Sequence, residues 1–264
     1  MSFEDLPKQI KQDIYFQTSE CMNQINAGVI QSIITSPPYW NLKDYQHPAQ
    51  IGYGDTYEEY LERLDNVWTE CKRVLNDTGT MWIVIDKLWR RRSVLHIPFH
   101  IAQHCKKIGF YLKDMIIWNK PTAIAGMNNR NLVNKHETIL FLSKNKNQYK
   151  LNLNAIEIGR KPDFNKYKLT DIWRFVVKAG SIRNTPNHKA PFPLELIERI
   201  LRLSTDEGDN VLDPFLGSGT TLRVAISMNR RCVGYEINPD FKAIIAQQLE
   251  NVNLSIIQKT LKSY

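Results

Sequence analysis

The stretch that decides the fold is Val211-Leu212-Asp213-Pro214-Phe215-Leu216-Gly217-Ser218-Gly219-Thr220-Thr221. Its first residues form a short apolar run typical of a buried strand, and the glycines predict a turn before a helix that reaches Met228. Glycines at 217 and 219 would let backbone N–H groups approach a ligand at the N-terminus of that helix. The stretch therefore predicts the strand, turn and helix of a nucleotide-binding α/β fold.

A second strand and an acidic residue follow at a suitable distance. Cys232-Val233-Gly234-Tyr235 predicts the strand, and Glu236 ends it roughly 20 residues after the glycines, where such folds carry a carboxylate for ribose hydroxyls. The third glycine of a dinucleotide fingerprint is missing, since Leu222 occupies its place. This argues against NAD as the ligand.

The other distinctive segment lies near the N-terminus, where the apolar pair Ile33-Ile34 leads into Thr35-Ser36-Pro37-Pro38-Tyr39-Trp40. We call residues 36–39 the proline turn. Two successive prolines remove two backbone donors and fix two φ angles, so a buried strand should leave the sheet here through a rigid, extended exit.

The proline turn suits a planar ring that carries an exocyclic amine. The amine could donate one hydrogen to the Ser36 hydroxyl and the other to the Pro37 carbonyl while Tyr39 stacks on the ring. Acceptors that pull these hydrogens out of the ring plane would direct the nitrogen lone pair toward an electrophile. Taken alone, the segment is equally compatible with a strand that merely exits through a proline turn beside core aromatics.

Composition sets the broad limits. The 264 residues suffice for one α/β domain with a modest insertion, and 42% hydrophobic residues can fill a sizeable core. The net charge of +8 is compatible with a polyanionic partner. No run of 18 apolar residues occurs, so we expect no membrane span and a cytoplasmic protein. The four cysteines form no CxxC pair, which argues against a disulfide framework.

Between the two motifs, hydrophobic periodicity predicts further helices and strands. Helices are expected over residues 55–75 and 194–203, a buried strand over 81–85, and strands over 111–118 and 138–143 that form a hairpin. His96, His100 and His104 recur at helical spacing, but neither a carboxylate nor a cysteine joins them, so we predict no metal site.

The proline turn resembles the signature of the amino-methyltransferases of DNA, in which Asp, Asn or Ser precedes Pro-Pro and an aromatic residue. Asp213-Pro214-Phe215 with the following Gly-Ser-Gly-Thr-Thr resembles the cofactor loop of the same enzymes. Because the proline turn comes first, the resemblance is to their beta group. It implies a circularly permuted Rossmann-like sheet with helices on both faces and an antiparallel edge hairpin, in a single domain over residues 1–264.

The resemblance also implies roles for individual residues. Those implied to be catalytic are Ser36, Pro37, Pro38 and Tyr39. Those implied to bind S-adenosylmethionine are Asp213, Pro214, Phe215, Gly217, Ser218, Gly219, Thr220, Glu236, Asn238, Lys189 and Pro191, within a cofactor-binding half over 186–250. The acidic residue that the family places after the first strand to meet adenine has no direct counterpart, and Ser19 and Glu20 both remain candidates.

DNA contacts are expected from basic and aromatic residues near the proline turn. The candidates are Trp40, Arg90, Arg91, Arg92, Arg130 and Lys135, although a basic run such as 90–92 is more often a solvated turn. Residues 144–185 interleave basic and aromatic side chains and are our candidate for a target-recognition insertion, with an irregular cover over the sheet edge as the alternative.

The function expected from the resemblance is transfer of a methyl group from S-adenosylmethionine to an exocyclic amine of a flipped base in double-stranded DNA. Ser36 favours cytosine N4, and adenine N6 is the alternative. A methyltransferase for ribosomal RNA or a protein glutamine, or an inactive binding module, are more remote alternatives. A separately encoded restriction endonuclease and a homodimer remain open.

Overall fold

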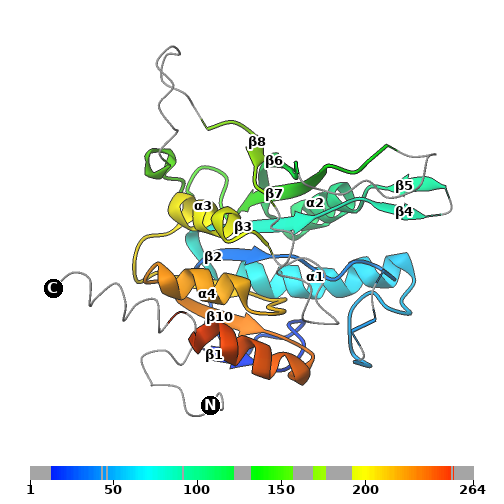
Figure 1. The fold of residues 1–264 in the computed structure, drawn as a ribbon, viewed down its shortest axis with the longest axis horizontal. Coiled ribbons are helices and arrows are strands. Elements are labelled where there is room, and N and C mark those ends of the chain that lie inside the picture. The colour runs from blue at the N-terminus through cyan, green and yellow to red at the C-terminus, as the bar shows by residue number, and fades with distance from the viewer. Residues whose placement is uncertain are drawn as a thin grey trace.

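The two motifs lie on neighbouring strands of an eight-stranded sheet whose order is β1-β10-β9-β2-β3-β7-β6-β8 (Figure 1). The computed structural model describes residues 13–42, 44–45, 47–90, 92–121, 132–156, 169–176, 192–250 and 252. The strands of this sheet are β1 (Asp13–Tyr15), β2 (Ile30–Thr35), β3 (Leu75–Ile85), β6 (Tyr111–Asn119), β7 (His136–Ser143), β8 (Ile172–Arg174), β9 (Asn210–Asp213) and β10 (Arg231–Tyr235).

The strand order confirms a circularly permuted Rossmann-like sheet. Five neighbouring strands, β1, β10, β9, β2 and β3, run parallel to one another. If the chain were read from β9, these strands would follow the order third, second, first, fourth, fifth of a doubly wound fold. The strand before the glycine motif, β9, would be the first strand of an unpermuted chain, but here β1, β2 and β3 precede it in the sequence.

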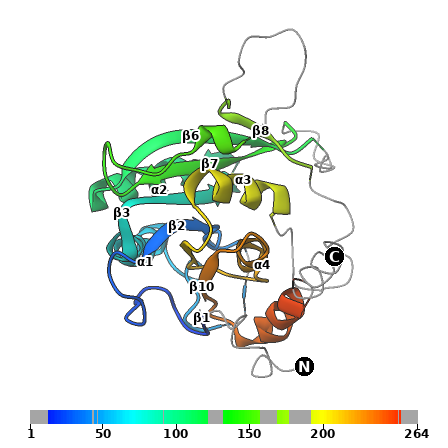
Figure 2. The same ribbon diagram turned by 90° about the vertical axis from the view of Figure 1, so that its left-hand side faces the viewer.

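Helices cover both faces of the sheet, as predicted (Figure 2). One face carries α1 (Tyr57–Val74) and α2 (Ile97–Ile108), and the other carries α3 (Leu194–Ser204) and α4 (Thr220–Ser227). The alternation of side chains along β2 supplies both interfaces, because Ile33 packs into the core with α1 and α2 while Ile34 packs into the core with α3 and α4. None of the described helices has the length and apolar character of a membrane span.

The beginning of α1 is fixed by a reciprocal cap. The Thr56 hydroxyl accepts a hydrogen bond from the Glu59 amide, and the Glu59 carboxylate accepts one from the Thr56 amide at 2.8 Å. This cap sets the position of the first turn of α1, from which Tyr57 and Tyr60 reach toward the proline turn.

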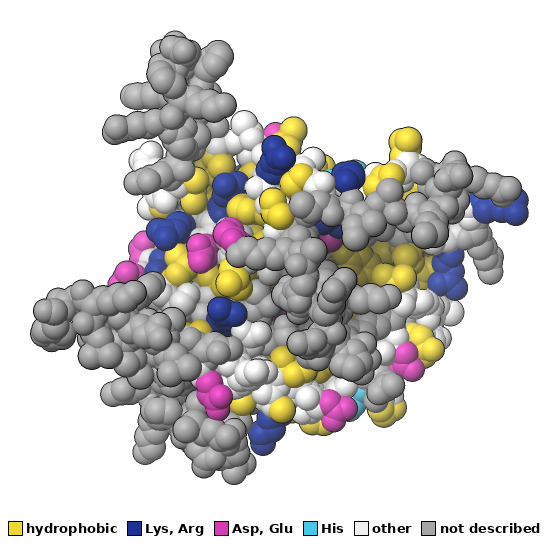
Figure 3. All heavy atoms as spheres, viewed as in Figure 1, with side chains coloured by type: hydrophobic (Ala, Val, Ile, Leu, Met, Phe, Trp, Pro, Cys, Tyr) yellow, Lys and Arg dark blue, Asp and Glu magenta, His cyan; other side chains and the backbone are white. Residues whose placement is uncertain are grey.

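The hairpin predicted from the sequence is formed by β6 and β7, which pair antiparallel. β8 pairs parallel with β6 and is the outermost strand at this end of the sheet. A separate two-stranded hairpin, β4 (Leu88–Arg90) and β5 (Ser93–Leu95), follows β3 and projects beyond the sheet (Figure 1). Lys and Arg side chains are visible at this projecting end in Figure 3.

The described part of the candidate insertion packs on the sheet. Trp173 of β8 is almost fully buried, and Tyr149 lies against Phe141 with ring centroids 5.8 Å apart. The short 3₁₀ turn η2 (Leu153–Ala155) lies in the same segment. Residues 157–168 and 177–185 lie outside the described part, so target recognition by this segment stays a prediction.

One hydrogen bond joins the ends of β2 and β9. Thr35 Oγ1 donates to Asp213 Oδ1 at 2.7 Å, although the two residues are 178 positions apart in sequence. The same carboxylate oxygen accepts the Phe215 amide at 3.1 Å. Burial nevertheless dominates and raises the pKa of Asp213 to about 6, while these hydrogen bonds oppose the rise.

Asp213→Asn should therefore remove a pH dependence of stability. The folded-state pKa of about 6 exceeds the unfolded value of 3.8, so Asp213 lowers the free energy of unfolding as the pH rises from about 4 to 6. The shift of roughly two pKa units corresponds to about 3 kcal/mol, which the asparagine variant should retain at neutral pH.

Urea unfolding of both proteins between about pH 4 and pH 7 measures the effect. Asp206→Asn is the matched control, because that side chain is 71% exposed. Stability curves of the wild type and of Asp213→Asn that stay parallel over this range would contradict the prediction.

Candidate functional site

The candidate site lies where the order of the parallel strands reverses, between β9 and β2. β2 pairs with β9 through Ile33 and Leu212, so the proline turn and the glycine turn leave adjacent parallel strands at the same edge. Ligands of open α/β sheets bind at the carboxyl ends of the strands at such a switch point. The two motifs that the sequence suggested are thus brought together, and Thr35 and Asp213 form the contact between them.

The proline turn presents two acceptors. Pro37 is buried and Ser36 is half-buried. Tyr60 Oη donates to the Pro38 carbonyl at 3.0 Å, which fixes the turn against α1. Within the described residues, neither the Ser36 hydroxyl nor the Pro37 carbonyl takes part in a hydrogen bond.

Tyr39 is anchored through its hydroxyl group. The Asp86 amide, directly after β3, donates to Tyr39 Oη at 2.9 Å. Burial raises the pKa of Tyr39 well above its usual value, and the nearby acids Glu137 and Asp86 raise it further, so the side chain stays a neutral phenol. The sequence identified the Tyr39 ring as a stacking surface but did not indicate this anchor, because Asp86 is remote in the chain.

The glycine turn, residues 216–219, is shaped by two left-handed residues. Gly217 has a φ of 53° and Gly219 a φ of 84°, a conformation that side chains disfavour. Gly219 is the N-cap of α4, and its position carries no side chain that could cap the helix. The amides of the first helical turn therefore face the site without a capping side chain.

Glu236 is held by backbone amides of the glycine turn and of the segment after β10. Its carboxylate accepts the Gly217 amide at 2.8 Å and the Asn238 amide at 2.9 Å. Burial raises the pKa of Glu236, and these amides act in the opposite direction. The Asn238 side chain in turn donates to the Tyr45 carbonyl at 3.0 Å, which connects this side to the segment after the proline turn.

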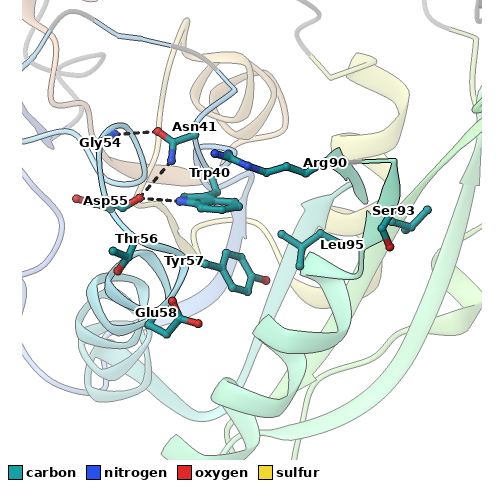
Figure 4. A pocket seen from close by; sticks show the side chains of 11 residues that line it. Trp40, Asn41, Gly54, Asp55, Thr56, Tyr57, Glu58, Arg90, Ser93 and Leu95 are labelled. Atoms are coloured by element: carbon teal, nitrogen blue, oxygen red, sulfur yellow. Dashed lines mark hydrogen bonds between the residues drawn. The ribbon is translucent and has the colours of Figure 1, made fainter.

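Trp40 and Arg90 line a pocket of about 530 Å³ beside the proline turn (Figure 4). The Arg90 guanidinium lies over the Trp40 ring at 4.0 Å, and Tyr57 packs on the same indole at 4.9 Å. Trp40 Nε1 donates to the Asp55 carbonyl at 2.9 Å. Arg90 is thus placed beside the candidate site, and Arg92 is exposed at the hairpin turn with a φ of 63°.

The remaining predicted residues have diverse positions. Lys135 Nζ donates to the Pro121 carbonyl at 3.2 Å. Arg91, Arg130, Lys189 and Pro191 lie outside the described residues, so their roles stay predictions.

The candidate acids after β1 differ in their contacts. Glu20 forms an ion pair of 2.8 Å with Arg63, which also contacts Asp55. Ser19 is buried, and its hydroxyl has no hydrogen-bond partner among the described residues. Glu20 is therefore committed to α1 in this structure.

The histidines of α2 contact α1. His104 Nδ1 lies 2.8 Å from Asp65 Oδ2, and His100 Nδ1 lies 2.7 Å from Tyr57 Oη. In the described part of the chain, no cluster of three or more metal-ligating side chains is present.

Comparisons with known proteins agree with this geometry. The family model described as DNA methylase, of the N6/N4 type, matches residues 30–247. The Type II methyltransferase M.Cfr9I from Citrobacter freundii is 30% identical, over 90% of this chain and 87% of its own length.

Two solved structures share the fold. TTHA0409 from Thermus thermophilus, solved in complex with S-adenosyl-L-methionine, is 28% identical with a TM-score of 0.67, over 92% of this chain and 94% of its own. The cytosine-N4-specific PvuII DNA methyltransferase is 18% identical with a TM-score of 0.75, over 92% and 90% of the two chains, which is a likeness of fold.

The family match covers both motifs and every strand from β2 to β10. The chain therefore belongs to the N6/N4 family of DNA methylases and is a DNA amino-methyltransferase.

Proposed function

We propose that the protein transfers a methyl group from S-adenosylmethionine to the N4 amine of a cytosine flipped out of double-stranded DNA. The observation that carries the proposal is a pair of acceptors without a hydrogen-bond partner among the described residues, the Ser36 hydroxyl and the Pro37 carbonyl, at the strand end next to the glycine turn. Adenine N6 remains the alternative target.

The residues of the glycine turn fit the cofactor. Left-handed glycines and the uncapped start of α4 suit a close approach by its polar parts. Glu236, which follows β10 and bonds to the glycine turn, would be the carboxylate for the ribose hydroxyls. Asp213 is a buried acid whose ionised form would be favoured by the cationic groups of the ligand. When bound, S-adenosylmethionine supplies an electrophilic methyl group.

The proline turn would then orient the amine. Ser36 and Pro37 each accept one of its hydrogens, which directs the nitrogen lone pair away from the ring plane and toward the cofactor side. Tyr39 would stack on the base, with the outer end of its ring held by the Asp86 amide. Because the two turns leave adjacent strands, donor and acceptor are positioned by a rigid sheet edge.

Serine at position 36 favours cytosine. Its side chain is shorter than the Asp or Asn that adenine-modifying relatives more often carry at this position, and among these enzymes the Ser-Pro-Pro pattern goes mainly with cytosine N4 methylation. The Type II relatives further suggest a restriction-modification role with a separately encoded endonuclease. A homodimer is a further proposal, which light scattering of the purified protein would test.

Glu236→Ala should weaken S-adenosylmethionine binding by about 1–3 kcal/mol, the usual scale for lost hydrogen bonds to a charged group. Isothermal titration calorimetry measures the dissociation constant. Glu207→Ala, at an exposed acid just before β9, is the control and should bind like the wild type. An unchanged constant for Glu236→Ala would remove Glu236 from the ribose role.

Tyr39→Ala should leave cofactor affinity nearly intact and cut methylation steeply, because a flipped base loses a stacking partner worth about 1–3 kcal/mol. Tyr39→Phe keeps the ring and should cost only about 3- to 10-fold in rate. Single-turnover rates with labelled cofactor measure both, with Tyr53→Ala on an exposed ring as the control. Equal losses in the two Tyr39 variants would assign the effect to the hydroxyl.

Changing Arg90 and Arg92 together to Ala should reduce the salt dependence of DNA binding. Each lost phosphate contact removes about 0.9 from the slope of log affinity against log salt, while sequence preference should hardly change. Fluorescence anisotropy with a duplex at several salt concentrations measures the slope. Lys106 and Lys107, exposed at the far end of α2, provide the matched pair, and an unaltered slope would return the hairpin to a solvated turn.

The methylated base can be identified directly. DNA incubated with the protein and S-adenosylmethionine should yield N4-methylcytosine after digestion to nucleosides and mass spectrometry. N6-methyladenine without N4-methylcytosine would reassign the base, and parallel incubations with RNA and protein substrates would reveal the more remote activities.

A further inference from the structure

A buried charge cluster at the ends of β3, β6 and β7 surrounds the residue that anchors Tyr39. Its members are Asp86 after β3, Lys120 after β6, Asn134 before β7, and Glu137 in β7. Lys120 Nζ lies 2.6 Å from Glu137 Oε1 and 4.0 Å from Asp86 Oδ2, and all three side chains are only 15–18% exposed. Neither of the two sequence motifs includes any of these residues.

The Asp86 carboxylate is fixed from several sides. Asn134 donates to Oδ2, the Lys87 amide donates to Oδ1 at 2.7 Å, and the Lys120 ammonium approaches the same carboxylate. Two carboxylates thus share one ammonium group, whose position is further limited by the Trp118 ring at 5.6 Å. Burial raises the pKa of both Asp86 and Glu137, and Lys120 opposes the rise in each case. Loss of Lys120 would leave two buried acids without their common partner.

The backbone of Asp86 connects this charge cluster to the proline turn. Its amide donates to Tyr39 Oη at 2.9 Å, so a fixed Asp86 fixes the position of the outer end of the Tyr39 ring. We propose that Lys120, Asn134 and Glu137 are positioning residues, which hold Asp86 so that its amide keeps the Tyr39 ring in place for stacking on the target base. The inference rests on the proposed function in one respect, which is that Tyr39 stacks on the target base.

Lys120→Met tests the proposal, with Lys120→Arg as the conservative variant. Lys120→Met should lower the single-turnover methylation rate about 3- to 10-fold, the scale of one lost hydrogen bond, with the dissociation constant for S-adenosylmethionine changed less than about twofold. Lys120→Arg should restore most of the rate. Lys144→Met is the matched control, because Lys144 is a half-buried, ion-paired lysine at the opposite end of β3.

A double variant separates positioning from general damage. In a Tyr39→Phe background the anchor is already lost, so Lys120→Met should cause little further loss of rate. Equal losses by Lys120→Met in both backgrounds would overturn the proposal. Should Lys120→Met fail to fold, Asn134→Ala, which removes a neutral donor to Asp86, is carried through the same comparison.

Hydrogen exchange of the Asp86 amide gives a readout that needs no methylation. Its protection should fall in Tyr39→Phe and in Lys120→Met and remain in Lys144→Met. Unchanged protection in Lys120→Met would also overturn the proposal. If wild-type protein shows the protected amide but methylates no DNA, the proposed function fails while the positioning role stands.

Discussion

The hydrogen bond from Thr35 to Asp213 is the contact on which the arrangement of this protein depends. It joins the last residues of β2 and β9 in a buried position, where an unpaired hydroxyl or carboxylate would be costly. Because the proline turn begins one residue and the glycine turn three residues beyond this bond, the bond sets the relative position of the two turns. The permuted order of the chain does not matter at this point, since only the neighbouring strands count.

Around this contact, several charged side chains are largely buried and accept hydrogen bonds from backbone amides. Glu236 is held by Gly217 and Asn238, and Asp86 by Asn134 and the Lys87 amide. Such groups are pre-organised, so little reorganisation is required when a ligand arrives. Tyr39 is also held by a backbone amide, because its hydroxyl accepts a hydrogen bond from Asp86.

The sequence predicted most of the fold because its signals were local. Hydrophobic patterns identified β6, β7, α1 and α3 within a few residues, and two prolines and two glycines marked the turns. The continuous apolar run over 81–85 identified only the second half of β3, which begins at Leu75. What it could not predict came from contacts between distant segments. The Asp86 anchor, the Lys120 cluster and the pairing of Glu20 with Arg63 depend on how strands and helices assemble, and no residue spacing encodes them. β8 was missed for a related reason, since three residues carry too little pattern.

The position of the proline turn has a consequence for the nucleic acid. It follows β2 in the middle of a sheet that is packed on both faces. Pro38 is bonded to α1, Tyr39 to the residue after β3, and the preceding Thr35 to β9. Within the described residues, the proline turn is thus held against its neighbours from two sides. Under the proposed function, the target base must therefore unpair, unstack and move to this fixed turn. Base pairs that open easily, such as those weakened by a mismatch, should accordingly be the ones that enter the site with the least delay.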